Sequence, residues 1–115
     1  MTVENNNINY IEFYAKELKA IKTFYTSVFG WTFTDYGDTY SAFSNSGLEG
    51  GFEAKNEPIT NGALIVLYHD NLDEVKQKII DFGGKISVDT FSFPGGKRFQ
   101  FIDPSGNELA VWRHE

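Results

Sequence analysis

Four polar residues have the side-chain chemistry to bind or to protonate a small organic molecule: Glu12, Arg98, Gln100 and Glu108. Each lies in a short segment in which apolar residues alternate, a pattern typical of a half-buried strand. A desolvated carboxylate such as Glu12 can act as a general base, and Arg98 can hold a ligand carboxylate through charged hydrogen bonds. Glu12 and Arg98 can equally form a structural ion pair, so both interpretations stay open.

Strand alternation predicts which side chains share a face with these four residues. Aliphatic and phenylalanine residues at every second position, such as Ile11 and Phe13, mark the face that packs against a helix. The residues between them face a cleft with aromatic walls and a few polar groups, which suits a small and mostly apolar ligand. We expect one solvent-accessible cavity to be shared by Tyr10, Glu12, Arg98, Gln100 and Trp112, with Tyr14, Tyr68 and Glu108 near its rim.

Several of these residues have a second interpretation. Tyr10, Tyr14 and Trp112 can be packed core or dimer-interface residues instead of ligand contacts. The histidines do not indicate catalysis, because His69 is predicted on the surface at a strand end and His114 in a C-terminal tail. No serine has a histidine within reach by motif, so a Ser-His-Asp triad is not supported.

The elements that position these residues repeat along the chain. Helices are predicted from Leu18 and from Leu72, because apolar residues recur with helical spacing at positions 18, 21, 25 and 28 and again at 72, 75, 79 and 82. Gly30 and Gly83 follow as left-handed C-caps, and Asn71 is a suitable N-cap. The predicted strands cover residues 8–14, 31–35, 39–44, 48–54, 63–68, 85–91, 98–102 and 108–112.

This order predicts an α+β fold of two βαβββ modules in tandem. The modules cover about residues 8–55 and 63–113, with a linker at residues 55–62. One module alone is too short for a good independent core. The 115 residues are therefore predicted to form a single domain.

Composition excludes several classes of function. The net charge of −6, without a basic patch, argues against a nucleic-acid partner. No apolar run is long enough to span a membrane, and the absence of a leader-like segment predicts a cytoplasmic protein. The chain has no cysteine, which excludes disulfides, thiolate metal sites and a cysteine nucleophile. Gly50-Gly51 and Gly95-Gly96 are predicted to be hairpin or bulge glycines and not phosphate-binding loops, because no helix follows them.

Two short motifs carry a resemblance to a known family. Phe24-Tyr25 and Phe29-Gly30-Trp31 end the first predicted helix, and Asp103-Pro104-Ser105-Gly106-Asn107 precedes the last predicted strand. Together with the duplicated module, they make residues 8–113 resemble the vicinal-oxygen-chelate superfamily, which includes glyoxalase I, bleomycin-resistance proteins and extradiol dioxygenases. The resemblance implies paired sheets that curl around a cleft, and a homodimer.

The resemblance also implies positions for a divalent metal, which the enzymes of this family bind with residues from the first and last strand of each module. Three of these positions hold Tyr10, Leu64 and Ala110 here, and the fourth falls near Glu49 or Glu53. Leucine and alanine cannot coordinate a metal, and tyrosine is a poor ligand for the ions concerned. We therefore expect no metal and no other cofactor, which argues against glyoxalase, dioxygenase or fosfomycin-type metal chemistry.

The leading hypothesis is a metal-free protein that binds a small, partly aromatic molecule in its cleft, with a role in sequestration or resistance. The alternative is a metal-independent or degenerate glyoxalase-like lyase or isomerase that uses Glu12 as its general base, so whether the protein is an enzyme stays open. A third class is a dimer with a purely structural or partner-binding role. The expected partners are a small molecule and a second copy of the chain, with no nucleic acid and no membrane.

Overall fold

The computed structural model of the protein describes residues 3–57 and 62–115. It divides into two compact units, and each is described by itself. The first unit is Tyr10–Leu64, and the second unit combines residues 3–9 with Ile65–Glu115. Both boundaries fall inside the strand that begins each predicted module. Part of the predicted linker, residues 58–61, lies outside the described residues.

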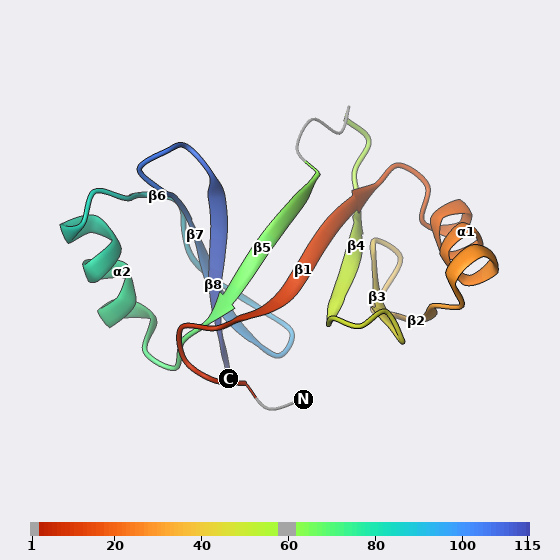
Figure 1. Cartoon of the computed structure of the whole chain (residues 1–115), viewed down its shortest axis with the longest axis horizontal. Helices are drawn as coiled ribbons and strands as arrows, with labels where there is room; N and C mark the ends of the chain where they lie inside the picture. Colours follow the sequence, from red (N-terminus) through yellow and green to blue (C-terminus); the bar gives the residue numbers. More distant parts are fainter. Residues whose placement is uncertain (1–2, 58–61) are drawn as a thin grey trace. The chain divides into compact units, whose positions relative to one another are not determined.

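The first unit contains a mixed sheet and one helix (Figure 1). Strand β3 pairs antiparallel with β2 and with β4, and β4 pairs in parallel with β1. This is the predicted order of one strand, one helix and three strands. The elements are β1 (Ile8–Ala15), of which the first two residues belong to the second unit, α1 (Leu18–Phe29), β2 (Thr32–Asp35), β3 (Tyr40–Ser44) and β4 (Gly50–Ala54).

The second unit repeats this order. Strand β8 pairs in parallel with β5 and antiparallel with β7, and β7 pairs antiparallel with β6. The predicted tail position of His114 is wrong, because the pairing of β8 with β7 continues to this residue, which lies opposite Gly96. The elements are β5 (Ala63–Tyr68), of which the first two residues belong to the first unit, α2 (Leu72–Asp81), β6 (Lys85–Phe93), β7 (Gly96–Ile102) and β8 (Glu108–His114).

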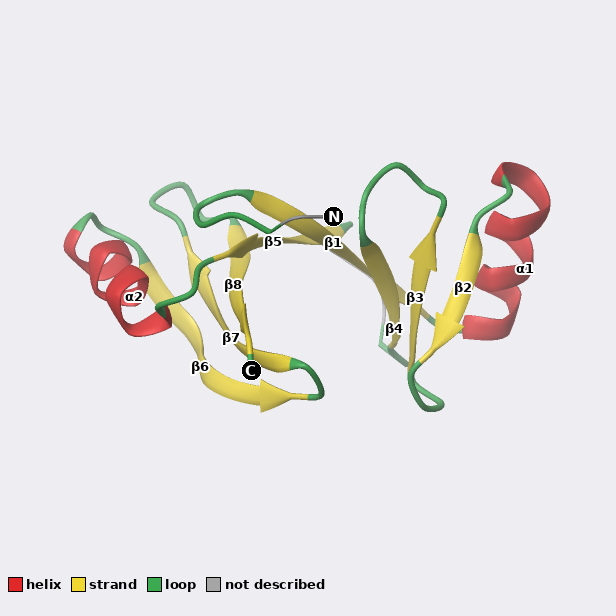
Figure 2. Ribbon diagram, turned by 90° about the horizontal axis from the view of Figure 1, so that it is seen from below, coloured by secondary structure: helices red, strands yellow, loops and turns green. Residues whose placement is uncertain are grey.

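Helix α1 covers one face of the sheet of the first unit (Figure 2). Ala15, Phe43 and Phe52 are buried there, and Ile21 and Tyr25 of the helix pack against them. The rings of Tyr25 and Phe52 have centroids 5.4 Å apart. The removal of these rings from water is the main favourable contribution to the folding of this unit.

Helix α2 covers one face of the sheet of the second unit in the same way (Figure 2). Leu72, Phe99 and Val111 are buried, and Val75 and Ile79 of the helix pack against them. The face that strand alternation assigns to the helix side is therefore confirmed for Phe99 and Val111.

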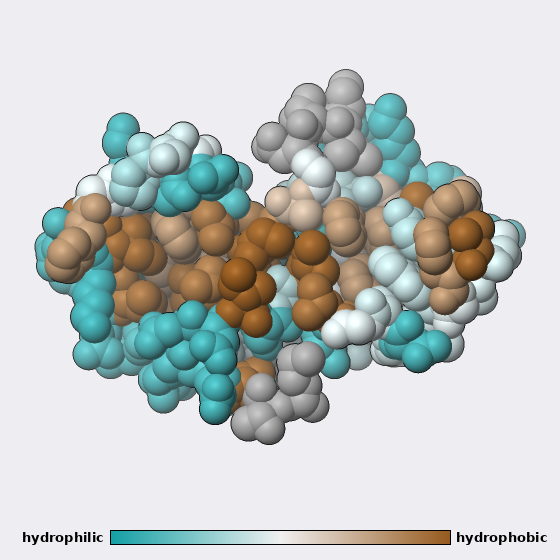
Figure 3. Space-filling model, viewed as in Figure 1, coloured by the Kyte–Doolittle hydropathy of each residue, from teal (hydrophilic) through white to brown (hydrophobic). Residues whose placement is uncertain are grey.

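The last apolar position of each predicted helix pattern is exposed. Val28 is 57% exposed and Phe82 is 83% exposed. Phe82 is the C-cap of α2, outside the helical stripe, and Gly83 follows it with a φ of 98°. Hydrophobic side chains also lie at the surface over α1, where Phe24 is exposed (Figure 3). Neither helix in the described part of the chain is long and apolar enough to cross a membrane.

The two helices differ in how their N-termini are capped. The side chain of Asn71 accepts a hydrogen bond from the Glu74 N–H at 3.1 Å, whereas Glu17 accepts one from the Lys19 N–H at 3.4 Å. We expect Asn71→Ala to lower the free energy of unfolding by about 1 kcal/mol, and Glu17→Ala to lower it clearly less. Denaturant unfolding of both variants measures the two losses of free energy of unfolding. Equal losses would contradict the conclusion that Asn71 is the stronger N-cap.

Candidate functional site

The predicted polar residues of the first unit lie on the sheet face opposite to α1. Phe13 packs into the phenylalanine core, so Tyr10, Glu12 and Tyr14 point to the other side, as strand alternation requires. The register of β1 and β4 places Glu53 beside Tyr14 on this face. Glu12 is only 3% exposed, whereas Tyr10 and Tyr14 are partly exposed.

A chain of hydrogen bonds connects three of these side chains. The hydroxyl oxygens of Tyr10 and Tyr40 lie 2.5 Å apart, and the Tyr40 hydroxyl donates to Oε1 of Glu12 at 3.1 Å. Sequence reasoning missed Tyr40. Phe43 in the same strand could have identified it. A phenylalanine at position 43 on the helix side places Tyr40, three positions earlier, on the opposite face.

Glycine in β4 makes this chain possible. Strand β4 lies between β1 and β3, and its Gly51 is paired with Glu12 on one side and with Ala42 on the other. A Cβ atom at Gly51 would collide with the hydroxyl and ring of Tyr40. The prediction that Gly50-Gly51 forms a hairpin or bulge is therefore wrong: both glycines lie inside β4, and Gly51 leaves room for the Tyr40 ring across the strand.

The two phenols of this chain are held in their neutral form. Burial raises the pKa of Tyr10 to about 12, and the negative charges of Glu12 and Glu49 add to this effect. Burial and the charge of Glu12 raise the pKa of Tyr40 well above its usual value. Neither hydroxyl ionises near neutral pH, so each acts there as a hydrogen-bonding group and not as a tyrosinate.

In the second unit, the predicted polar residues form a continuous row. Nη2 of Arg98 donates to Oε1 of Gln100 at 3.2 Å, and Nε2 of Gln100 donates to Oε2 of Glu108 at 3.1 Å. The hydroxyl of Ser87 donates to the same Glu108 oxygen at 2.7 Å. The Arg98 guanidinium also lies 5.3 Å from the centroid of the Phe91 ring, a cation–π contact that orients it.

Aromatic rings lie beside this row. Trp112 is directly opposite Arg98 in the pairing of β7 and β8, and it contacts the Tyr68 ring edge-on with centroids 5.2 Å apart. The His114 ring completes this group, with its centroid 4.7 Å from the centroid of the Trp112 ring. The indole N–H of Trp112 donates to Asn9 at 2.8 Å. Trp112 thus has a fixed orientation beside the Arg98–Gln100 pair.

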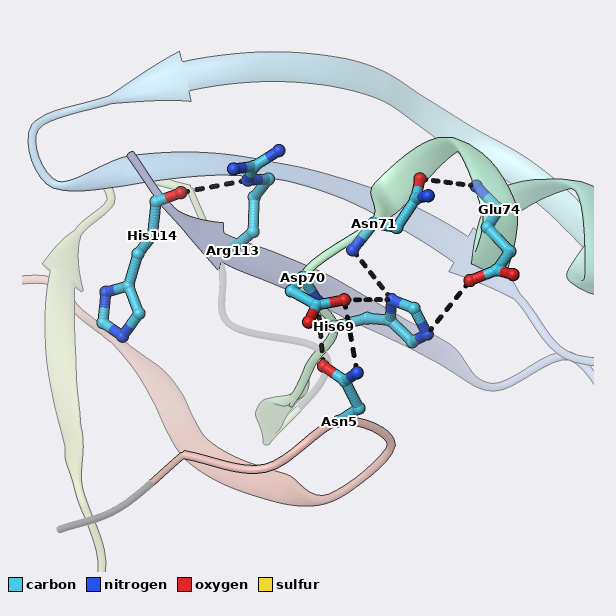
Figure 4. A network of polar contacts seen from close by, with 7 residues as sticks. All are labelled: Asn5, His69, Asp70, Asn71, Glu74, Arg113 and His114. Atoms are coloured by element: carbon cyan, nitrogen blue, oxygen red, sulfur yellow. Dashed lines mark hydrogen bonds and ion pairs between the residues drawn. The ribbon is translucent and has the colours of Figure 1, made fainter.

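His69 differs from its prediction as a surface residue. It is 8% exposed and lies between the end of β5 and the N-cap of α2 (Figure 4). Its Nδ1 accepts a hydrogen bond from the Asn71 N–H at 2.9 Å, and its Nε2 lies 3.9 Å from Oε2 of Glu74. Asp70 is held in place by Asn5, which exchanges two hydrogen bonds with it. The prediction did not anticipate that Asn71 and Glu74, at the start of α2, contact the two nitrogens of the imidazole.

The residues at the implied metal positions do not fit a metal. Leu64 and Ala110 carry no donor atom, and the oxygen of Tyr10 is hydrogen-bonded to Tyr40. For the fourth position, Glu53 lies inside β4, and Glu49 precedes the strand. Within residues 3–57 and 62–115, no group of three histidine, cysteine, aspartate or glutamate side chains is placed to hold an ion.

The structure thus brings the predicted site residues together in two groups, one in each unit. Each group lies on the face of its own sheet that is turned away from the helix. A single cavity shared by both groups stays a prediction. The first unit contributes Tyr10, Glu12 and Tyr14, and the second unit contributes Tyr68, Arg98, Gln100, Glu108 and Trp112.

Comparison with known proteins connects this fold to one family. Residues 7–111 match the model of the Glyoxalase/Bleomycin resistance protein/Dioxygenase superfamily. The protein named "Putative glyoxylase CFP32" of Mycobacterium bovis is 29% identical in an alignment of 119 positions that covers 91% of this chain. The chain spans only 44% of the length of that relative.

Two solved structures have the same fold. Methylmalonyl-CoA epimerase from Mycobacterium tuberculosis matches with a TM-score of 0.77 and 9% identity, over 100% of this chain and 92% of that one. The Mn(II)-bound glyoxalase from Novosphingobium aromaticivorans matches with a TM-score of 0.69 and 21% identity, over 97% of this chain and 40% of that one. At these identities, the likeness shows the fold alone.

The raised pKa of Tyr10 predicts a loss of stability at alkaline pH. A tyrosine ionises at about pH 10 in the unfolded chain and at about 12 in the folded chain. Its contribution to the free energy of unfolding is therefore complete below about pH 10 and falls as the pH rises toward 12. Denaturant unfolding across this range should show a shallower fall for Tyr10→Phe than for the unchanged protein. A fall in the free energy of unfolding that Tyr10→Phe leaves unchanged would contradict the assignment.

Proposed function

Because the chain belongs to the Glyoxalase/Bleomycin resistance protein/Dioxygenase superfamily, we propose that it binds a small organic molecule without a metal or another cofactor. The ligand contacts are the side chains on the sheet faces turned away from the helices. Tight binding of a toxic compound would by itself support a role in sequestration or resistance. A cytoplasmic location stays a prediction.

The row of Arg98, Gln100 and Glu108 beside Trp112 is the observation that carries this proposal. Arg98 is oriented by Gln100 at 3.2 Å and by the Phe91 ring. A guanidinium held in this way is suited to a ligand carboxylate. Trp112, which is opposite Arg98 in the strand pairing, offers an aromatic surface for an attached ring.

The alternative, an enzyme with Glu12 as its general base, has no specific observation in its favour. Oε1 of Glu12 already accepts the hydroxyl of Tyr40 at 3.1 Å. The name of the relative CFP32 contains the word glyoxylase, but this chain spans 44% of its length. Binding is therefore the function that the geometry supports best.

Arg98→Ala tests the carboxylate anchor. With benzoate as the probe, we expect this substitution to weaken binding by about 1.5–3 kcal/mol, the scale of a charged hydrogen bond. Tryptophan fluorescence in a Trp31→Phe background reports the titration, because Trp112 is then the only tryptophan. Lys97→Ala is the matched control, since Lys97 is the neighbouring cation in β7 and alternation places it on the opposite face. Equal affinity of the Arg98→Ala variant and the unchanged protein would contradict the proposal.

We also propose a homodimer, because β2 and β6 each pair with one strand in the described residues and leave an edge exposed. Native mass spectrometry of tag-free protein tests the dimer and the absence of metal together. We expect a species of two 13.0 kDa chains without a stoichiometric divalent ion. A 13.0 kDa species at micromolar concentration would contradict the dimer, and one retained zinc, nickel or manganese ion per chain would contradict metal-free binding.

A further inference from the structure

The hydrogen-bond chain in the first unit has a fixed direction. The Tyr40 hydroxyl has one proton, and it donates this proton to Oε1 of Glu12 at 3.1 Å. The Tyr40 oxygen then accepts the proton of Tyr10, at the 2.5 Å separation of their oxygens. The hydroxyl oxygen of Tyr10 is left with a lone pair and no proton to donate, and Tyr10 is partly exposed.

Two features keep this direction in place. Glu12 is 3% exposed, so a hydrogen bond to its carboxylate is not easily exchanged for one to water. The Tyr40 ring lies over Gly51, where no side chain competes for the space. Tyr40 is therefore held close to both of its partners.

The charges around Tyr10 favour a positive group. Glu12 and Glu49 both act on the Tyr10 hydroxyl electrostatically. Further along the same face, Nζ of Lys55 lies 4.4 Å from the centroid of the Tyr14 ring. This face thus already holds one ammonium group of the chain itself against a tyrosine.

We propose that the Tyr10 hydroxyl oxygen binds a hydrogen-bond donor of the ligand, with a primary ammonium group as the preferred donor and a hydroxyl group next. This inference rests on the proposed small-molecule binding and names the ligand chemistry selected by the first unit. A group that only accepts hydrogen bonds, such as a ketone, is disfavoured at Tyr10, because its oxygen would meet the lone pair of the phenol.

Two cations that differ in donor capacity test the proposal. Benzylammonium carries N–H donors, whereas benzyltrimethylammonium has the same charge and ring but no donor. We expect benzylammonium to bind about tenfold more tightly, the usual effect of a charge-assisted hydrogen bond. NMR titration at neutral pH, followed at the amide signals around Tyr10 and Glu12, measures both affinities.

Substitutions separate the hydrogen bond from other causes. Tyr10→Phe removes the acceptor and should abolish the preference for benzylammonium. Tyr40→Phe releases the Tyr10 proton, so acetophenone, which only accepts, should bind more tightly to this variant than to the unchanged protein. Tyr36→Phe, which alters an exposed tyrosine of the same unit, should change neither result.

The proposal is overturned if the two cations bind equally, if neither perturbs the signals around Tyr10, or if the preference persists in Tyr10→Phe. Amide spectra of each variant establish whether its fold is intact. We expect an intact fold, because each substitution removes only one hydroxyl group. Failure of the proposed function would instead appear as unchanged binding of benzoate to the Arg98→Ala variant. This result is distinguishable, because Arg98 belongs to the second unit and Tyr10 to the first.

Discussion

Burial of one phenylalanine-rich sheet face against a single helix is the constraint on which both units depend. In the first unit, Phe43 and Phe52 are buried under α1; in the second, Phe99 is buried under α2. Since side chains alternate along a strand, this burial commits every intervening residue to the other face. The hydrogen-bonded side chains of Tyr10, Tyr40 and Glu12, and those of Arg98 and Gln100, lie on the sheet faces away from the helices, because the residues that alternate with them are packed under the helices.

Periodicity in the sequence was sufficient to predict the order of helices and strands and the faces of β1, β7 and β8. These features follow from local spacing, which one sequence displays directly. The role of Gly51 could not be predicted in this way, because the need for glycine comes from Tyr40, which belongs to another strand. The place of Asp70, next to His69, likewise involves a distant segment, because Asn5 is hydrogen-bonded to it. Contacts between residues far apart in sequence decide both cases.

The family carries its chemistry in a few positions of a tolerant framework. Here the implied metal positions include Leu64 and Ala110, which are buried apolar residues. The polar groups of this chain lie instead at other positions of the same faces, such as Tyr40 and Gln100. The fold of the family is therefore preserved while these positions carry apolar side chains and the polar side chains lie elsewhere on the sheets.

The segment that precedes β1 has a consequence for the order in which the chain can fold. Asn5 is hydrogen-bonded to Asp70, 65 positions away, and Asn9 to Trp112, 103 positions away, so the second unit includes residues from both ends of the sequence. The first unit is continuous from Tyr10 to Leu64. During synthesis, all residues of the first unit leave the ribosome before β8 is made, whereas the second unit is complete only when β8 becomes available to residues 3–9. Residues 3–9 are thus made before the whole of the first unit, and Asn9 reaches its contact with Trp112 only after that unit has been made.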